Sequence, residues 1–331
     1  MIDERSRLQS VGKRIDTQLP SEIVRGSATS KYWLQVQFRE MYSRTRPGFR
    51  SLIPYGYDPF DQAKVISYFD LKGFEYGNWL NQEDRYNYLW AAQIALFDLV
   101  KITGIQKVGL SKLVGIAFGA RGRKGALAHF EPDTNMINIT RFHEAKTVKD
   151  LSGNPVFGNK TTDMVKPVLF EQTGGMGSLA HEYGHSLDYI FGGYVEVDPA
   201  RKDRSLTNGR STLDKATTTA APGTMRGLTA EIINTLIWEN QAKKDIYTTF
   251  YAKLNIAVSA KVLSPYWIRQ NELFARTFES YIQMKLEKKG IENSFLTHKK
   301  YESWVYPNGV LLKKIEPLMD KLLAIMAKHS K

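Results

Sequence analysis

The stretch GSLAHEYGHSLD, residues 177–188, contains the pattern H-E-x-x-H at His181, Glu182 and His185. On a helix with 100° per residue, the two histidines lie about 40° apart on one face and one turn from each other. Two imidazoles in this arrangement can bind one metal ion, and the glutamate beside them can take a proton from a metal-bound water molecule. The pattern therefore predicts a metal-binding helix near 179–191. Two ordinary helix histidines are the alternative.

A catalytic zinc site needs a third protein ligand and leaves a fourth position open. The chain has no cysteine, so this ligand must be His, Asp or Glu. The longer pattern H-E-x-x-H-x-x-G-x-x-H is absent, because Asp188 and Phe191 stand where its glycine and last histidine would be. The best candidate is Glu272 in the segment NELFARTFE, residues 271–279, and Glu279 on the same helix face is the second choice. A solvated helix acid is the alternative for Glu272.

Two further residues are candidates for supporting roles. Asp188 follows His185 by three residues on the same predicted face, where it can hold an imidazole N–H. Tyr266 precedes Glu272 by six residues and can donate its phenol to an oxyanion. The alternatives are a solvent-facing acid for Asp188 and simple packing for Tyr266. The remaining histidines have no motif around them and are interpreted as structural or surface residues: His129, His143, His298 and His329.

The composition is that of a folded protein with a basic surface. The chain has 331 residues, of which 42% are hydrophobic, so it can bury a substantial core. No apolar run approaches the roughly 18 residues that a membrane span needs, and the segment Met1 to Arg7 lacks the apolar core of a secretion signal. The formal net charge of +12 attracts polyanions. A generally basic surface and proximity to DNA are both compatible with this charge, and no nucleic-acid-binding motif accompanies it.

The order of apolar and turn-forming segments predicts an α+β fold. Apolar residues recur at helical spacing in 83–102. Residues 51–80 are rich in Gly, Pro and aromatics and are expected to form a loop-rich cover. Everything after Met225 is expected to be helical with short breaks. Three short runs separated by turn residues are interpreted as a β-meander: 113–118, 126–130 and 136–140.

The expected helix boundaries and domains follow from the same signals. Ser178 is a suitable N-cap for the metal-binding helix, and Gly192-Gly193 is a suitable end. We expect three parts, an N-terminal cover segment, a central domain and a C-terminal helical extension: 1–68, 69–290 and 291–331.

Several ordered blocks of the sequence resemble a known family. FEYGNW (74–79), GIAFGARG (115–122), AHFEP (128–132), INIT (137–140), the block that contains His181, and ELFARTFE (272–279) look like the first of the large polyvalent-protein-associated domains. The resemblance covers roughly 69–192 and 263–283, and the chain departs from it by the extra stretch 141–173. Domains of this family occur in proteins of phages, plasmids and conjugative elements that are thought to enter a recipient cell with the DNA.

More distantly, the His181 helix and the Glu272 segment are similar to the catalytic domain of anthrax lethal factor, a zinc endopeptidase. This similarity implies a zincin-like core with Zn²⁺ on His181, His185 and Glu272, and it favours Glu272 over Glu279. It also implies a catalytic role for Tyr266. In zincins the edge strand of the sheet pairs with extended substrate, and either 136–140 or 126–130 is the expected edge.

The resemblance and the motif together predict a zinc-dependent endopeptidase of a phage or mobile element, acting on a protein or peptide substrate. Glu182 is the expected general base, and the expected location is the cytoplasm of the host cell or a virion that delivers the protein with DNA. No membrane partner is expected. The alternative is a virion structural or cargo protein, close to DNA or to other virion proteins, that keeps the zincin fold with latent or no activity. A DNA-associated accessory factor is a further alternative.

Overall fold

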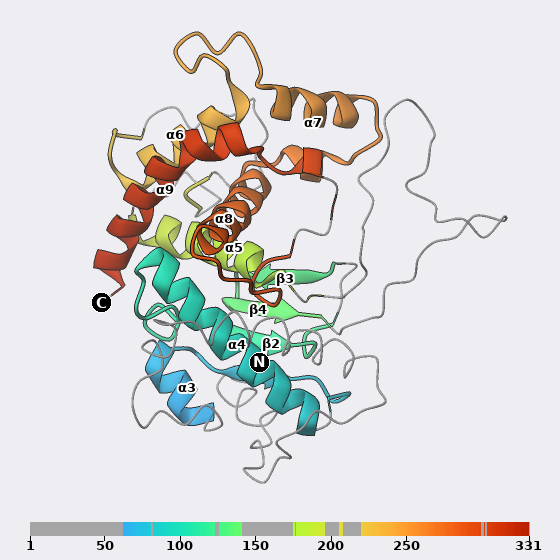
Figure 1. The fold of residues 1–331 in the computed structure, drawn as a ribbon, viewed down its shortest axis with the longest axis vertical. Coiled ribbons are helices and arrows are strands. Elements are labelled where there is room, and N and C mark those ends of the chain that lie inside the picture. The colour runs from blue at the N-terminus through green and yellow to red at the C-terminus, as the bar shows by residue number, and fades with distance from the viewer. Residues whose placement is uncertain are drawn as a thin grey trace, which may run out of the picture.

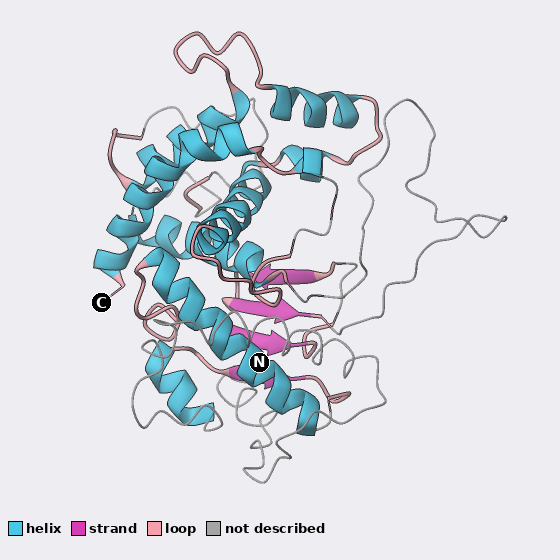
Figure 2. Ribbon diagram, viewed as in Figure 1, coloured by secondary structure: helices cyan, strands magenta, loops and turns pink. Residues whose placement is uncertain are grey.

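A computed structural model of the chain describes its central and C-terminal parts (Figures 1 and 2). The described residues are 62–80, 82–122, 126–140, 175, 177–195, 205–207, 220–298, 301 and 303–330. Most of the expected cover segment 1–68 and all of the extra stretch 141–173 lie outside this part of the chain.

A four-stranded sheet forms the lower half of the molecule in Figure 1. Its strands are β1 (Phe74–Tyr76), β2 (Gly115–Phe118), β3 (Ala128–Glu131) and β4 (Met136–Ile139). The spatial order is β1-β2-β4-β3, in which β1, β2 and β4 are parallel and β3 runs antiparallel to β4.

The predicted β-meander is therefore wrong in its order, although its three strands exist. In a meander β3 would lie between β2 and β4, but β4 pairs directly with β2 and β3 occupies the outer position. Burial explains this order, because all four residues of β4 are buried whereas three of the four residues of β3 are only half-buried. Of the two expected edge strands, β3 is an edge and β4 is internal.

Two helices cover one face of the sheet. The ring of Tyr88 on α4 (Gln82–Thr103) lies 4.9 Å from the ring of Phe118 on β2. The ring of Tyr189 on α5 (Leu179–Val195) lies 6.0 Å from the ring of Phe130 on β3. The prediction of a long core helix over 83–102 is confirmed by α4. The prediction that Gly192-Gly193 ends the second helix is wrong, because α5 continues through both glycines.

The C-terminal part is helical, as predicted from Met225 onward. It contains α6 (Met225–Ile237), α7 (Thr249–Ser259), the 3-10 turn η2 (Pro265–Ile268), α8 (Gln270–Glu287), the 3-10 turn η3 (Ser303–Val305) and α9 (Gly309–His329). Helix α9 packs against α6, α4 and α8, so the expected C-terminal extension contributes to the same hydrophobic core as the central domain. The expected loop-rich cover also contains a short helix, α3 (Gln62–Phe69), which packs on α4. Among the described residues, no helix is both long and apolar enough to cross a bilayer.

Candidate metal centre

The histidine helix α5 and the glutamate helix α8 approach each other closely at Gly184. A Cβ atom at this glycine would lie 3.3 Å from the Cα atom of Ala275 and 3.3 Å from the Cβ atom of Phe278. Side chains larger than hydrogen would therefore push the helices apart. The close contact explains how the pattern H-E-x-x-H and a residue far downstream reach a common site.

The start of α5 is fixed by backbone hydrogen bonds to the segment that follows α8. The N–H of Gly177 donates to the carbonyl of Phe295 at 3.0 Å, and the N–H of Ala180 donates to the carbonyl of Leu296 at 2.8 Å. Gly177 has a φ of +81°, a conformation that glycine adopts without steric cost. The helix begins directly after Ser178, as predicted, and the carbonyl of Ser178 accepts the N–H of Glu182 at 3.0 Å.

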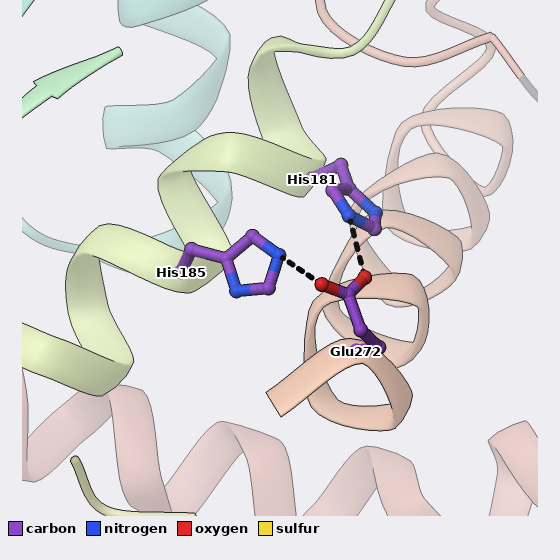
Figure 3. A group of neighbouring side chains, drawn as sticks. All are labelled: His181, His185 and Glu272. Carbon is purple, nitrogen blue, oxygen red and sulfur yellow. Dashed lines mark ion pairs between the residues drawn. The ribbon is translucent and has the colours of Figure 1, made fainter. Parts of the chain in front are cut away.

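Three side chains from the two helices meet at one point (Figure 3). Nε2 of His181 lies 3.4 Å from Oε2 of Glu272, and Nε2 of His185 lies 3.4 Å from Oε1 of the same carboxylate. One ligand atom from each of His181, His185 and Glu272 lies within 4.8 Å of the other two. The structure thus brings together the three residues that the sequence predicted as ligands.

The protonation states of His181 and Glu272 are coupled. Burial by itself lowers the pKa of His181, but the interactions with Glu272 and Glu279 outweigh it and raise the pKa to about 10. Burial by itself raises the pKa of Glu272, but the positive charges of His185 and His181 hold it well below its usual range. Without a metal the cluster is therefore a buried pair of imidazolium and carboxylate.

Two imidazoles and one carboxylate are a donor set that zinc commonly binds. The Nε2 atoms of His181 and His185 each lie 3.4 Å from the Glu272 carboxylate, each from a different oxygen atom. Oε2 of Glu272 is buried and makes no well-aligned hydrogen bond with a described residue, and its charged neighbours are His181 at 3.4 Å and Arg276 at 4.0 Å. Buried polar atoms are usually paired, so this oxygen is one that a metal ion could use.

Glu182 follows His181 on α5. The backbone N–H of Phe130 on β3 is close enough to the Glu182 carboxylate to lower its pKa slightly. Burial raises the pKa of Glu182, while the nearby charges of His181 and His185 lower it less. A raised pKa brings a buried carboxylate closer to the pH range in which it can take up and release a proton.

Tyr266 lies on η2, and its phenol is close enough to the Glu272 carboxylate for the charge of that group to raise its pKa. Burial and the charge of Glu272 raise the pKa of this phenol, although the whole residue is 38% exposed, so one part of the ring faces solvent. The guanidinium of Arg269 lies 5.9 Å from the centre of the same ring. The predicted proximity of Tyr266 to the metal ligands is thus present.

Arg276 also belongs to this site. In the sequence it is marked only by its position four residues after Glu272, which is a weak signal. It is buried, and its Nη1 lies 4.0 Å from Oε2 of Glu272. Its Nη2 donates to the carbonyl of Trp267 at 2.5 Å, and its guanidinium lies 5.1 Å from the Trp267 ring centre. Arg276 therefore ties η2, with Tyr266, to the helix that carries Glu272.

The two predicted supporting acids differ in position. Oε2 of Glu279 lies 3.6 Å from Nδ1 of His181, on the ring nitrogen opposite the one that faces Glu272. This is the position of a residue that orients a ligand, and not of a third ligand. The carboxylate of Asp188 accepts the backbone N–H of Thr207 at 2.9 Å and its hydroxyl at 2.7 Å. Contact of Asp188 with an imidazole stays a prediction.

Among the described residues, the three other histidines do not belong to this cluster. His129 lies on β3, where its Nε2 is 3.3 Å from Oε1 of Glu131. His298 follows α8, and its backbone N–H donates to the carbonyl of Gly177 at 2.9 Å. His329 ends α9 and contacts the carbonyl of Ile325. His143 lies outside the described residues.

Comparison with known proteins adds one match. Residues 259–330 match the family described as large polyvalent protein-associated domain 1. The match includes the predicted stretch 263–283 and extends to the end of α9, while the predicted stretch 69–192 lies outside it. The predicted resemblance is confirmed over this part of the chain, and it associates the protein with phages and mobile elements. No curated protein matches the chain. No solved structure matches it either.

Proposed function

We propose that the chain is a zinc-dependent endopeptidase of a phage or mobile element. The observation that carries this proposal is the meeting of His181, His185 and Glu272, whose ligand atoms lie within 4.8 Å of one another although they come from two separate helices. Zinc held by three protein ligands lowers the pKa of a water molecule and polarises a carbonyl group. The residues around the site would supply the remaining requirements of peptide hydrolysis.

Glu182 is the proposed general base and later proton donor. It is buried beside the histidines and is not one of the three clustered residues. Burial raises its pKa, so its protonated form is more stable here than it would be in water. Tyr266 is proposed to stabilise the oxyanion with its phenol, which lies at the Glu272 carboxylate in the metal-free protein.

The position of β3 at the edge of the sheet is an argument for a peptide substrate. The carbonyl of Leu127 accepts the N–H of Thr140, so Leu127 turns its backbone groups toward β4. In an antiparallel ladder this orientation alternates from residue to residue. The backbone groups of Ala128 and Phe130 therefore face the side of β3 that pairs with no described strand. An extended peptide can pair with such an edge. Glu182 is close to the backbone N–H of Phe130 on this edge, so a peptide bound there would pass beside the proposed base.

The test compares the wild-type protein with Glu182→Gln, which is nearly isosteric and leaves the three ligands intact. Both proteins are expected to hold one zinc by elemental analysis, and only the wild type should generate new termini in a host lysate examined by terminal-peptide mass spectrometry. General-base catalysis contributes about 10²–10⁴-fold, so the loss should be large. The matched control is Glu231→Gln, which removes an exposed acid on α6.

Two outcomes would contradict the proposal. Equal turnover by Glu182→Gln and the wild type, with zinc in both, would exclude the mechanism. No cleavage by either protein, with zinc present, would favour the second candidate, a virion cargo or DNA-associated protein. The net charge of +12 is the observation that favours this candidate.

A further inference from the structure

The 3-10 turn η2, which carries Tyr266, has little support of its own. The N–H of Trp267 donates to the carbonyl of Ser264, and the N–H of Arg269 donates to the carbonyl of Tyr266, both at 3.2 Å. Hydrogen bonds of 3-10 turns have poorer geometry than those of α-helices. The N-cap residue Ser264 makes no side-chain cap bond, and of the four residues of η2 only Ile268 is buried. Contacts with neighbouring elements must therefore hold the turn in place.

The side chain of Tyr266 adds little to this support, because the residue is 38% exposed. Its ring lies 6.0 Å from the ring of Trp267 and 5.9 Å from the guanidinium of Arg269. Both of these residues belong to the same short segment of chain, so they move together with the phenol and do not fix it relative to the metal centre. The position of the phenol is therefore set by the backbone of η2.

Arg276 on α8 holds η2 through two contacts with one residue, Trp267. Its Nη2 donates to the carbonyl of Trp267 at 2.5 Å, and its guanidinium lies 5.1 Å from the centre of the Trp267 ring. The ring of Tyr301 meets the same indole edge-on, at 5.1 Å. A planar guanidinium can donate to a carbonyl and stack on a ring at once, whereas the ammonium group of a lysine is a point charge. An arginine at this position is thus suited to fix both the backbone and the side chain of Trp267.

The other charged group near Arg276 is Glu272, and its contact is the weaker one. Nη1 of Arg276 lies 4.0 Å from Oε2 of Glu272, which is beyond hydrogen-bond distance. The bond to the Trp267 carbonyl is short, charge-assisted and buried. The main effect of Arg276 should therefore fall on η2 and not on the carboxylate of the candidate ligand.

We propose that Arg276 is a positioning residue for the phenol of Tyr266. It fixes Trp267, and through the chain it fixes the neighbouring Tyr266 beside the metal centre. The inference rests on the proposed function in one respect, because an effect of the phenol on turnover requires that the protein is an endopeptidase. The rigidity of η2 does not depend on that function and is tested separately.

Hydrogen exchange of the full-length protein without zinc, measured by mass spectrometry, tests the positioning itself. Arg276→Lys keeps the charge and loses the planar fork, so the backbone N–H groups of Trp267 and Arg269 should exchange about tenfold faster or more than in the wild type. The matched control is Arg226→Lys. Arg226 is also a buried arginine, and it donates at 3.0 Å to the carbonyls of Ser205 and Gly192, neither of which belongs to η2. This control should leave exchange in η2 unchanged.

Steady-state kinetics on a cleaved peptide test the route by which Arg276 acts. Arg276→Lys should lower kcat on the order of 10–10²-fold through misplacement of the phenol, with zinc affinity unchanged. In a Tyr266→Phe background the same substitution should change kcat by less than about twofold, because the group that Arg276 positions is already absent. Tyr266→Phe by itself should leave exchange in η2 as it is in the wild type.

Unchanged exchange in η2 of Arg276→Lys overturns the proposal. A loss of kcat that is additive with Tyr266→Phe, or one accompanied by weaker zinc binding, also overturns it, because either result would mean that Arg276 acts through another group such as Glu272. If Arg276→Lys does not fold, Trp267→Leu removes the ring that faces the guanidinium and should also accelerate exchange in η2. Absence of cleavage by the wild type would contradict the proposed function, and the exchange measurement would still decide the positioning.

Discussion

The carboxylate of Glu272 contacts two imidazole rings at once, one through each oxygen atom. Glu279 contacts only one ring, and on its other nitrogen. At the scale of single residues, this difference suits Glu272 to the proposed role of third ligand and Glu279 to that of a residue that orients His181. It also predicts that the two glutamates respond differently to substitution.

We expect Glu272→Ala to abolish stable zinc binding and Glu279→Gln to weaken it about 10–100-fold, as is usual when the partner of a ligating histidine is lost. Competition with a chromophoric chelator measures both affinities. Glu231→Gln on α6 is the matched control and should bind like the wild type. Full zinc occupancy in Glu272→Ala, together with its loss in Glu279→Ala, would show that the third ligand has been misassigned.

The phenol of Tyr266 gives a second prediction at this scale. Tyr266→Phe keeps the ring that packs near Arg269 and Trp267 and removes only the hydroxyl group. If the phenol stabilises an oxyanion, kcat should fall on the order of 10–10³-fold while zinc content stays at one. Steady-state kinetics on a cleaved peptide measures this. An unchanged kcat would mean that Tyr266 only packs.

At the scale of elements, the contact between α5 and α8 determines whether the ligands meet. Gly184→Val should separate the two helices, because the glycine has neighbours at 3.3 Å on α8. We expect a lower melting temperature and weaker zinc binding. Gly193→Ala on the same helix is the control, because a Cβ atom at Gly193 would meet no described residue within 4 Å.

The control should stabilise the protein by roughly 0.5–1 kcal/mol, since alanine is the better helix former. Thermal unfolding with and without zinc compares the two variants. If Gly184→Val binds zinc as tightly as Gly193→Ala, the helix contact is not what positions Glu272.

The helices and the sheet differ in how well the sequence predicts them. The meeting of His181, His185 and Glu272 was predictable because helical spacing and a sequence block single them out without knowledge of the sheet. The strand order was not, because the pairing of β2 with β4 depends on which strand is buried on both faces, a property of the assembled core. Arg276 was missed for a similar reason, since its contact with Trp267 arises only when η2 folds back on α8.

At the scale of the whole molecule, an ion-pair cluster joins α8 to α9. Glu316 on α9 lies 2.7 Å from Nζ of Lys288 and 2.9 Å from Nζ of Lys285, and Asp320 lies 2.9 Å from Lys285. The hydrogen bonds from Lys288 and Lys285 hold the pKa of Glu316 below its ordinary value of 4.5. The resulting stabilisation is therefore complete above pH 4.5 and is lost as the pH falls through the lower pKa of the folded state.

We expect Glu316→Gln to lower the free energy of unfolding at pH 7 by about 0.2–1 kcal/mol, the range of partly exposed ion pairs. The difference from the wild type should shrink as the pH is lowered below about 4. Urea unfolding at several pH values measures this, with Glu231→Gln as the control. A difference that persists unchanged at low pH would assign the effect to packing and not to charge.

The position of Glu272 on α8 also bears on the synthesis of the protein. About ninety residues separate His185 from Glu272, so a growing chain that has emerged only as far as α5 contains two of the three clustered groups. At a translation rate of about 5–20 residues per second, several seconds pass before the third group leaves the ribosome. During that interval the nascent chain lacks the complete cluster, so no metal ion can be held by all three groups until α8 has folded onto α5.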